Sequence, residues 1–185
     1  MQEKENVLDI LKGVRTAVKD DDSRKLRELS DRTIHSSSIF QDGDNIAVAV
    51  IVYSLAKILE RKNYRGYGGW KGFLKKYMKN IDWAIKALEN DNLEDFREAI
   101  KAVRLTINGL SGSFKLSIQE LFKKAEINKA SRIYEHGVSM EATAKLLGIS
   151  MWDLAEYAGN TGIGDVDLGV TMPEKQRVKL GMEIF

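Results

Sequence analysis

The sequence predicts an all-α protein, an N-terminal helical bundle joined to a C-terminal helix-turn-helix module. Apolar residues recur at steps of three and four along most of the chain, which is the spacing of one face of a helix. Pro173 is the single proline among 185 residues, and Lys and Glu are abundant. Proline interrupts helices whereas Lys and Glu favour them, so this composition agrees with the periodicity.

The first two helices are separated by an acidic run. Apolar residues at 7, 8, 11, 14 and 18 form one face of a helix that ends at residues 20–22. Ser23, with Asp22 beside it, then offers a side-chain oxygen to the first N–H groups of a second helix, which contains Leu26 and Leu29. The turn QDGDN at 41–45 closes this second helix.

The segment 46–52 is rich in β-branched residues and is compatible with a buried strand or a buried helix. Its apolar pattern continues to Leu59, beyond the usual length of a strand, and Asp44 is a suitable cap. We therefore predict a buried helix over about 45–62, followed by a glycine-rich loop, RKNYRGYGGW.

Three further helices follow. One spans about 70–89, and Asn92 caps the next, which has acidic residues in its first turn. The segment NGLSGS at 108–113 is the clearest internal breaker, and it precedes a long helix over about 115–136 that Gly137 ends. We identify no internal sequence repeat.

These elements predict three parts. Residues 1–110 form a helical bundle for dimerisation or partner binding, and 113–165 form the long helix and the helix-turn-helix. Residues 166–185 contain a glycine-rich linker and a short helix, in which Thr171 and Glu174 have capping-box spacing.

Composition narrows the function classes. The chain has no cysteine and two histidines, which excludes disulfides, thiolate metal sites and a cysteine nucleophile. No stretch has the length and apolar character of a spanning helix or a signal peptide, so we expect a cytoplasmic protein without a membrane partner. The net charge is only +2, but residues 57–86 contain nine cations and two anions.

Residues 139–157 have the pattern of a helix-turn-helix. Ala144 is small where the second helix crosses the first, Gly148 permits the sharp turn, and Ser150 caps the second helix. Ile149 plugs the angle between the helices, and Leu154 and Tyr157 face the first helix. Positions at fixed offsets make this pattern more informative than an isolated glycine turn.

The segment SMEATAKLLGISMWDLAEYAG resembles the helix-turn-helix of small archaeal and bacterial proteins predicted to be antitoxins or DNA-binding regulators. In that family the pattern Ala…LLGIS-x-W-[DE] precedes a glycine-containing tail, here NTGIGD, and the resemblance covers about 128–165. It implies binding to a promoter, including the protein's own as an autorepressor, and a toxin as partner. We expect a homodimer on duplex DNA, without a cofactor or a metal.

The second helix is unusual for base recognition because its polar residues are acidic, and 128–163 carry a net charge of −1. The basic stretch, residues 57–86, supplies the missing cations. We predict that the residues near DNA in the module are Ser139, Lys145, Ser150, Met151, Trp152 and Asp153. We predict phosphate contacts from Arg61, Lys62, Arg65, Lys71, Lys75, Lys76 and Lys79.

Two alternatives remain open. The helix-turn-helix is also compatible with a protein-interaction scaffold that does not bind nucleic acid. In the basic stretch, cations alternate with Tyr64, Tyr67, Trp70 and Tyr77, which can stack on RNA bases. The same stretch is equally compatible with a solvated lysine face above aromatics that lie in the core.

We predict no enzymatic activity. His35 shares a helix face with Asp31, which is too few ligands for a metal site, and no base accompanies Ser36–Ser38. His136 is placed to interact with the end of its helix. The helical N-terminal part superficially resembles the HEPN ribonucleases, which carry an Arg and a His separated by four to six residues. The Arg–His separations here are seven, two and three residues, so the match fails.

Overall fold

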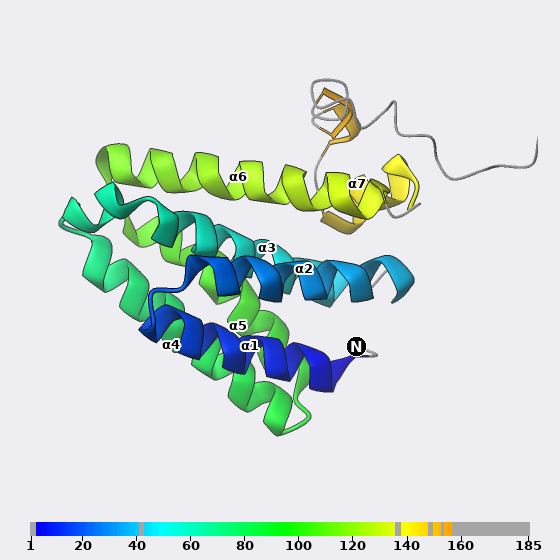
Figure 1. Ribbon diagram of the computed structural model, residues 1–185, viewed down its shortest axis with the longest axis horizontal. Coiled ribbons are helices and arrows are strands. Elements are labelled where there is room, and N and C mark those ends of the chain that lie inside the picture. Colours follow the sequence, from blue (N-terminus) through cyan, green and yellow to red (C-terminus); the bar gives the residue numbers. More distant parts are fainter. Residues whose placement is uncertain (1–2, 41–42, 136–137, 148–149, 153, 157–185) are drawn as a thin grey trace, which may run out of the picture.

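The computed structural model confirms the all-α class (Figure 1). It describes residues 3–40, 43–135, 138–147, 150–152 and 154–156, and for 34–40, 135 and 146–147 it describes the backbone only. Within these ranges all regular structure is helical. The elements are α1 (Lys4–Lys19), α2 (Ser23–Phe40), α3 (Gly43–Glu60), the 3₁₀ turn η1 (Lys62–Gly66), α4 (Trp70–Glu89), α5 (Leu93–Leu105), the 3₁₀ turn η2 (Thr106–Gly109), α6 (Gly112–Glu135) and α7 (Met140–Leu147).

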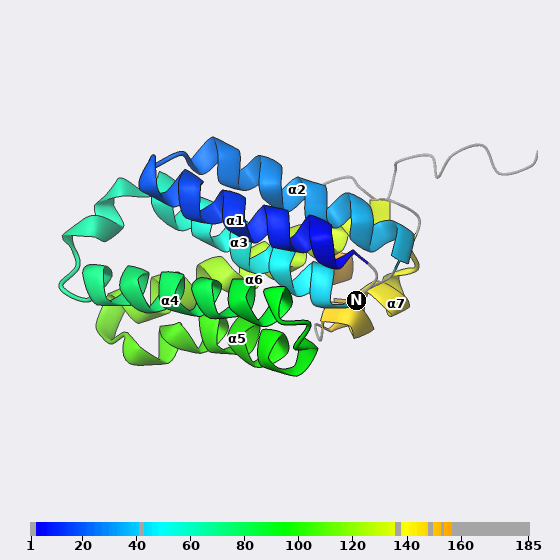
Figure 2. The ribbon, with the colours of Figure 1, turned by 90° about the horizontal axis from the view of Figure 1, so that it is seen from below.

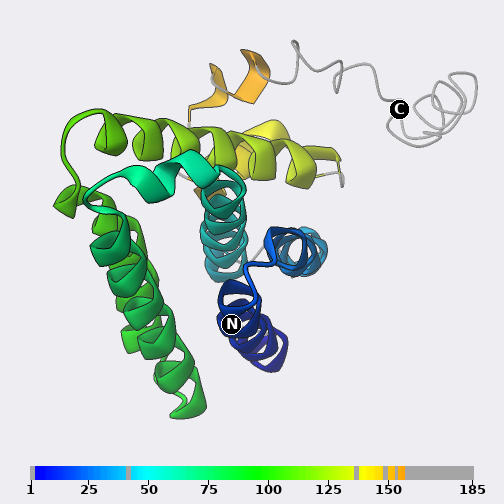
Figure 3. The same cartoon turned by 60° about the vertical axis from the view of Figure 1, so that its left-hand side comes forward.

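Helix α3 is the centre of the molecule and contacts α1, α2, α5, α6 and α7. Figures 2 and 3 show the α1–α2 pair on one side of α3 and the α4–α5 hairpin on the other, while α6 lies along α3 and leads to α7. Because α3 is buried on nearly every side, its sequence is apolar all round. The prediction of a buried helix here is confirmed, and the strand alternative for 46–52 is wrong.

The main core runs continuously from α1 to the first half of α6, where Phe114, Ile118, Leu121 and Phe122 join it. The glycine-rich breaker at 108–113 is therefore a turn within one core, since the residues that precede and follow it pack together. A smaller apolar cluster, formed by Ile46, Ala49, Ile133, Val138 and Ala142, attaches α7 to α3 and α6.

Two hairpin turns in the fold have the same geometry. Residues 17–29 (AVKDDDSRKLREL) connect α1 to α2, and 87–99 (ALENDNLEDFREA) connect α4 to α5. In both turns the amide of the third turn residue donates to the carbonyl of the alanine five residues earlier, at 2.8 and 2.9 Å. The residue at the centre of each turn, Asp21 or Asp91, has positive φ, 54° and 56°. The structure thus reveals a local correspondence, seventy positions apart, that the overall sequence pattern did not.

The same turns cap the helices that follow. The Asp22 carboxylate accepts from the Lys25 amide at 2.9 Å, and the Asn92 side chain accepts from the Asp95 amide at 3.0 Å. The predicted cap at Asn92 is confirmed, whereas in the first turn the observed acceptor for the Lys25 amide is Asp22, the neighbour of Ser23. Each hairpin turn is thereby fixed by hydrogen bonds among its own residues.

We expect Asp21→Ala and Asp91→Ala each to lower the free energy of unfolding by about 1 kcal/mol, because a residue with a Cβ and no local hydrogen bond is strained at positive φ. Asp21→Asn and Asp91→Asn remove the ion pairs with Arg65 and Lys4 but keep tolerance of this conformation. These Asn variants should therefore unfold in urea close to the wild type. Equal losses for the Ala and Asn variants would assign the effect to the ion pairs instead.

Candidate functional site

Helix α7 is the first helix of the predicted helix-turn-helix. We refer to α7 and the described residues that follow it, 150–152 and 154–156, as the helix pair. The Ser139 side-chain oxygen accepts from the Ala142 amide at 3.1 Å and so caps the helix, a role that the sequence analysis did not assign to it. Ala144 is buried, as expected for the small residue at a helix crossing. Lys145 is exposed on the same helix.

The segment after α7 presents one face to solvent. Residues 151, 152 and 154–156 are helical, and the Leu154 amide donates to the Ser150 carbonyl at 3.3 Å. Leu154 is fully buried, whereas Met151 is 51% exposed and Trp152 is 85% exposed. The turn residues Gly148 and Ile149, together with Asp153 and Tyr157, lie outside the described residues, as do Gly137, His136 and everything predicted for 158–185.

All seven basic residues predicted to contact phosphate are exposed. Arg65 forms an ion pair with Asp21, and Arg61 donates to the Tyr64 hydroxyl at 2.7 Å. The five lysines form no ion pair within the described ranges: Lys62, Lys71, Lys75, Lys76 and Lys79. Four of these lie on α4, so this helix carries an uncompensated positive face.

The aromatic residues of the basic stretch lie in the core. Tyr64, Trp70 and Tyr77 are almost fully buried, and the half-buried Tyr67 stacks on Phe114 with 4.8 Å between ring centroids. The Tyr77 hydroxyl donates to the Ile51 carbonyl at 2.6 Å, and burial raises the pKa of this phenol. The interpretation of these rings as stacking platforms for bases is therefore wrong in this conformation, because the rings hold η1, α4 and α6 together.

The basic stretch and α7 are attached to opposite ends of α6. Phe114, near the start of α6, contacts Tyr64 and Tyr67 of the basic stretch, while Ile133, near its end, contacts the segment before α7. A helix of 24 residues is about 36 Å long, close to one turn of duplex DNA.

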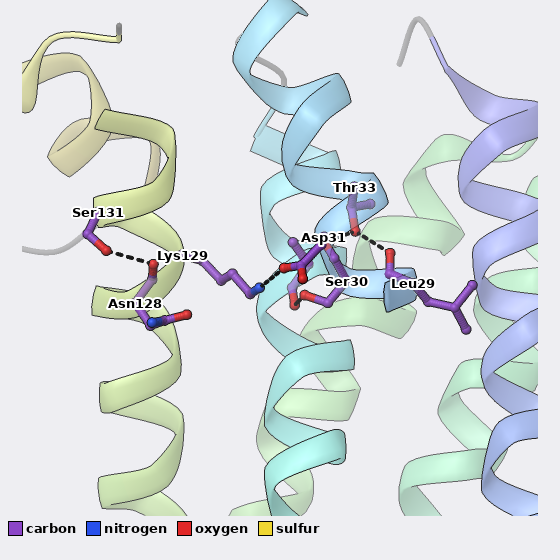
Figure 4. Close-up of polar contacts among 8 residues, drawn as sticks. Leu29, Ser30, Asp31, Thr33, Asn128, Lys129 and Ser131 are labelled. Carbon is purple, nitrogen blue, oxygen red and sulfur yellow. Dashed lines mark hydrogen bonds and ion pairs between the residues drawn. The ribbon is translucent and has the colours of Figure 1, made fainter. Parts of the chain in front are cut away.

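Lys129 of α6 is a buried cation that the sequence analysis missed (Figure 4). Its side chain is 1% exposed, and its ammonium lies 2.8 Å from the Asp31 carboxylate of α2 and 4.2 Å from the centroid of the Tyr53 ring. Burial lowers the pKa of Lys129, and the Asp31 carboxylate opposes this shift. Its position four residues from both Ala125 and Ile133 places it on the apolar face of α6, which is the signal that was available in the sequence.

We expect Lys129→Met to change how stability depends on pH. The folded chain releases the Lys129 proton at a lower pH than the unfolded chain, whose lysine pKa is about 10.4. Between these two pKa values the unfolded chain binds more protons, so the free energy of unfolding rises with pH. The free energy of unfolding of Lys129→Met, measured in urea across this alkaline range, should lack the rise with pH that Lys129 causes. A difference in free energy of unfolding between variant and wild type that is the same at every pH would contradict this expectation.

Asp31→Asn should destabilise more than Lys129→Met. Asp31 is 51% exposed, so its carboxylate stays hydrated when the lysine is absent. Asp31→Asn instead leaves the buried Lys129 ammonium without its partner and should lower the free energy of unfolding by roughly 2 kcal/mol. Equal losses in urea unfolding at neutral pH would show that the pair acts symmetrically.

A cavity of about 700 Å³ lies between the C-terminal half of α3 and the middle of α6. Tyr53, whose ring contacts the Lys129 ammonium, forms part of its wall, and Glu156 of the second helix of the pair lies at the cavity too. The cavity is therefore bounded both by the bundle and by the segment that carries Met151 and Trp152. The sequence alone did not predict it.

Two buried polar side chains, Asn45 of α3 and Thr143 of α7, have no hydrogen-bond partner in the described part of the chain. A buried hydroxyl without a partner costs about 1–3 kcal/mol relative to a satisfied one. Both residues belong to the elements that attach the helix pair to the bundle.

We expect Thr143→Val to raise the free energy of unfolding by about 1 kcal/mol, because valine fills the same volume without the unpaired hydroxyl. The matched control is Thr33→Val, since the Thr33 hydroxyl is buried and donates to the Ser30 carbonyl at 2.8 Å. Thermal unfolding of the two variants should shift in opposite directions. A destabilised Thr143→Val protein would show that the hydroxyl has a partner in solution.

The described residues contain no group of three or more His, Cys, Asp and Glu side chains arranged to hold a metal ion. They also contain no helix with the length and apolar character needed to cross a bilayer. Comparisons with protein-family models, curated proteins and solved structures gave no match to this chain.

Proposed function

We propose that this protein is a DNA-binding regulator of the cytoplasm, in which α7 and the segment from 151 form a helix-turn-helix. The observation that supports this most directly is the contrast between Leu154, which is fully buried, and the neighbouring Met151 and Trp152, which are exposed. A recognition helix needs this arrangement, because one side must pack on its partner helix while the other enters the major groove. Ser150, which precedes Met151 in the chain, and Lys145 of α7 are also exposed.

The positive face of α4 supplies the phosphate attraction that the helix pair lacks. The exposed ionisable group of the described second helix is Glu156, whereas the lysines at 71, 75, 76 and 79 form no ion pairs within the described ranges. A duplex bound to the segment that carries Met151 and Trp152 would approach the basic stretch, because Glu156 of this segment and Arg61 line the same cavity. Phosphate contacts of this kind position a protein on DNA, and base contacts from the helix pair would provide specificity.

The resemblance to antitoxins and small regulators leads us to propose an autorepressor that acts as a homodimer and binds a toxin. A two-fold dimer would place two recognition helices about 34 Å apart on successive turns of the groove. The helical bundle, which makes up most of the chain, would then provide the dimer contact or the toxin contact. We propose no catalytic role for it.

The double substitution Lys75→Gln with Lys76→Gln tests the role of α4. If both lysines contact phosphates, the slope of the logarithm of affinity against the logarithm of salt concentration should fall by about two units. Gel retardation of a random duplex at several salt concentrations measures this slope. Weak binding should be expected for a random sequence, so the titration must begin at low salt.

The matched control is Arg24→Gln with Lys25→Gln, which removes two adjacent exposed cations from the start of α2. This control should retain the wild-type slope. An equal loss in both double variants would indicate nonspecific attraction by net charge. The absence of retardation even at low salt, by a protein shown to be folded, would contradict DNA binding.

The second candidate function is a protein-interaction scaffold, and the exposure of Trp152 and Met151 favours it. Aromatic residues and methionine are enriched at protein interfaces, whereas bases are usually read by hydrogen-bonding side chains. The salt titration separates the two functions. A scaffold should show no salt-dependent retardation, and it should retain its partner when Lys75 and Lys76 are replaced.

A further inference from the structure

The cavity between α3 and α6 has the size of a small-molecule site. Its volume of about 700 Å³ lies within the range of roughly 300–1,000 Å³ that is usual for such sites. It is bounded by α3, α6 and Glu156. A molecule in it would therefore contact both the bundle and the second helix of the helix pair.

The cavity wall combines apolar surface with charge. Leu121, Ala125 and Ile127 of α6 supply its apolar part. The charged residues around it are the cations Lys57, Arg61, Lys123 and Lys124 and the carboxylates Glu60, Glu120 and Glu156. Cations are therefore in excess by one. This combination fits a ligand with an apolar body and one anionic group.

Arg61 is the cation best placed to accept the anionic group. Lys57 is already paired with Glu60 at 3.0 Å, and Lys124 with Glu120 at 2.6 Å. Arg61 instead donates to the Tyr64 hydroxyl and forms no ion pair within the described residues, although its charge also acts on Glu120, whose pKa is lowered first by Lys124 and then by Arg61. A guanidinium has five N–H donors in a fork that matches a carboxylate or a sulfonate, so most of its donors remain for a ligand.

The Tyr53 ring limits the kind of ligand. The Lys129 ammonium lies 4.2 Å from the ring centroid, and the Lys57 ammonium lies 5.5 Å from it. Because cations already interact with this ring, it offers little free face for stacking a nucleobase. An amphipathic organic acid fits the wall better than a nucleotide does.

We propose that this cavity binds an organic anion with an apolar body, and that the anion displaces Glu156. The Glu156 carboxylate has the same charge as the ligand and lies at the same cavity, so the two repel each other when Arg61 holds the ligand. Displacement of Glu156 moves the helical segment that carries Met151 and Trp152. In a DNA-binding regulator, this movement makes the cavity an effector site. That conclusion rests on the proposed function, whereas binding of the anion and displacement of Glu156 do not.

Anilinonaphthalene sulfonate is a suitable probe, and phenylnaphthylamine is the same molecule without the sulfonate. Fluorescence titration without DNA should show that Arg61→Gln weakens binding of the anionic probe roughly tenfold, the loss expected for one charge-assisted hydrogen bond. Glu156→Gln should tighten it roughly threefold, because it removes an exposed like charge. Neither variant should change binding of the neutral probe.

The control variants are Arg24→Gln and Glu28→Gln, which make the same charge changes at exposed positions of α2. They should leave binding of the anionic probe unchanged. Nonspecific adsorption predicts that both probes bind equally well and that Arg61→Gln and Glu156→Gln do not act in opposite directions. That result would refute the proposed binding site.

Hydrogen exchange tests the displacement without DNA. The anionic probe should speed exchange in 150–156 of the wild type and leave the α4–α5 hairpin unchanged. Unchanged exchange in 150–156 at saturation would overturn the displacement. Retardation of duplex DNA with and without the probe then tests regulation, since a ligand that moves the helix must alter DNA affinity. A protein that binds the probe but no DNA would refute the proposed function and leave the site established.

Discussion

The burial of α3 on nearly every side is the constraint on which the rest of the structure depends. A helix with apolar residues around its whole circumference is stable in water only if neighbours cover every face. The two hairpins cover two sides and α6 covers a third. The molecular surface that remains for function is therefore the outer face of these covering helices and the cavity at which Tyr53, Lys57 and Glu60 of α3 are only half-buried.

The covering helices differ in how polar groups fix them to the centre. Helix α2 is tied to α3 by the Ser30 hydroxyl, which donates to the Ala49 carbonyl at 2.8 Å, and α5 by Arg97, which binds the Asp44 carboxylate with two nitrogens. Lys129 ties α6 to α2 across the top of α3. These contacts are specific in position, and apolar packing alone would permit a helix to slide along α3. The buried lysine is thus best understood as a determinant of alignment rather than as a source of stability.

Much of the fold followed from the sequence because helical periodicity and caps are local signals. Asn92 and the period of α4 are examples, since each depends on residues within a few positions. The burial of Tyr64 and Trp70, the Lys129–Asp31 pair and the cavity were not predictable in this way. They depend on which helix packs beside which, and residues 31 and 129 meet only because both helices cover α3. The basic stretch illustrates the difference: its charge was evident in the sequence, but the placement of its aromatics was decided by packing against Phe114.

The attachment of the helix pair is the point where structure and proposed function meet. The pair rests on a small apolar cluster, and the buried Asn45 and Thr143 beside this attachment lack hydrogen-bond partners. A site that must adapt to a groove or a partner needs a free-energy difference between its positions of only a few kcal/mol. The large α3 core does not provide this, since its apolar residues form one continuous cluster. The small cluster does, because few residues attach α7 to α3 and α6. The cavity lies farther along α3 and Glu156 forms part of its wall, so an occupant would act directly on the segment that follows α7.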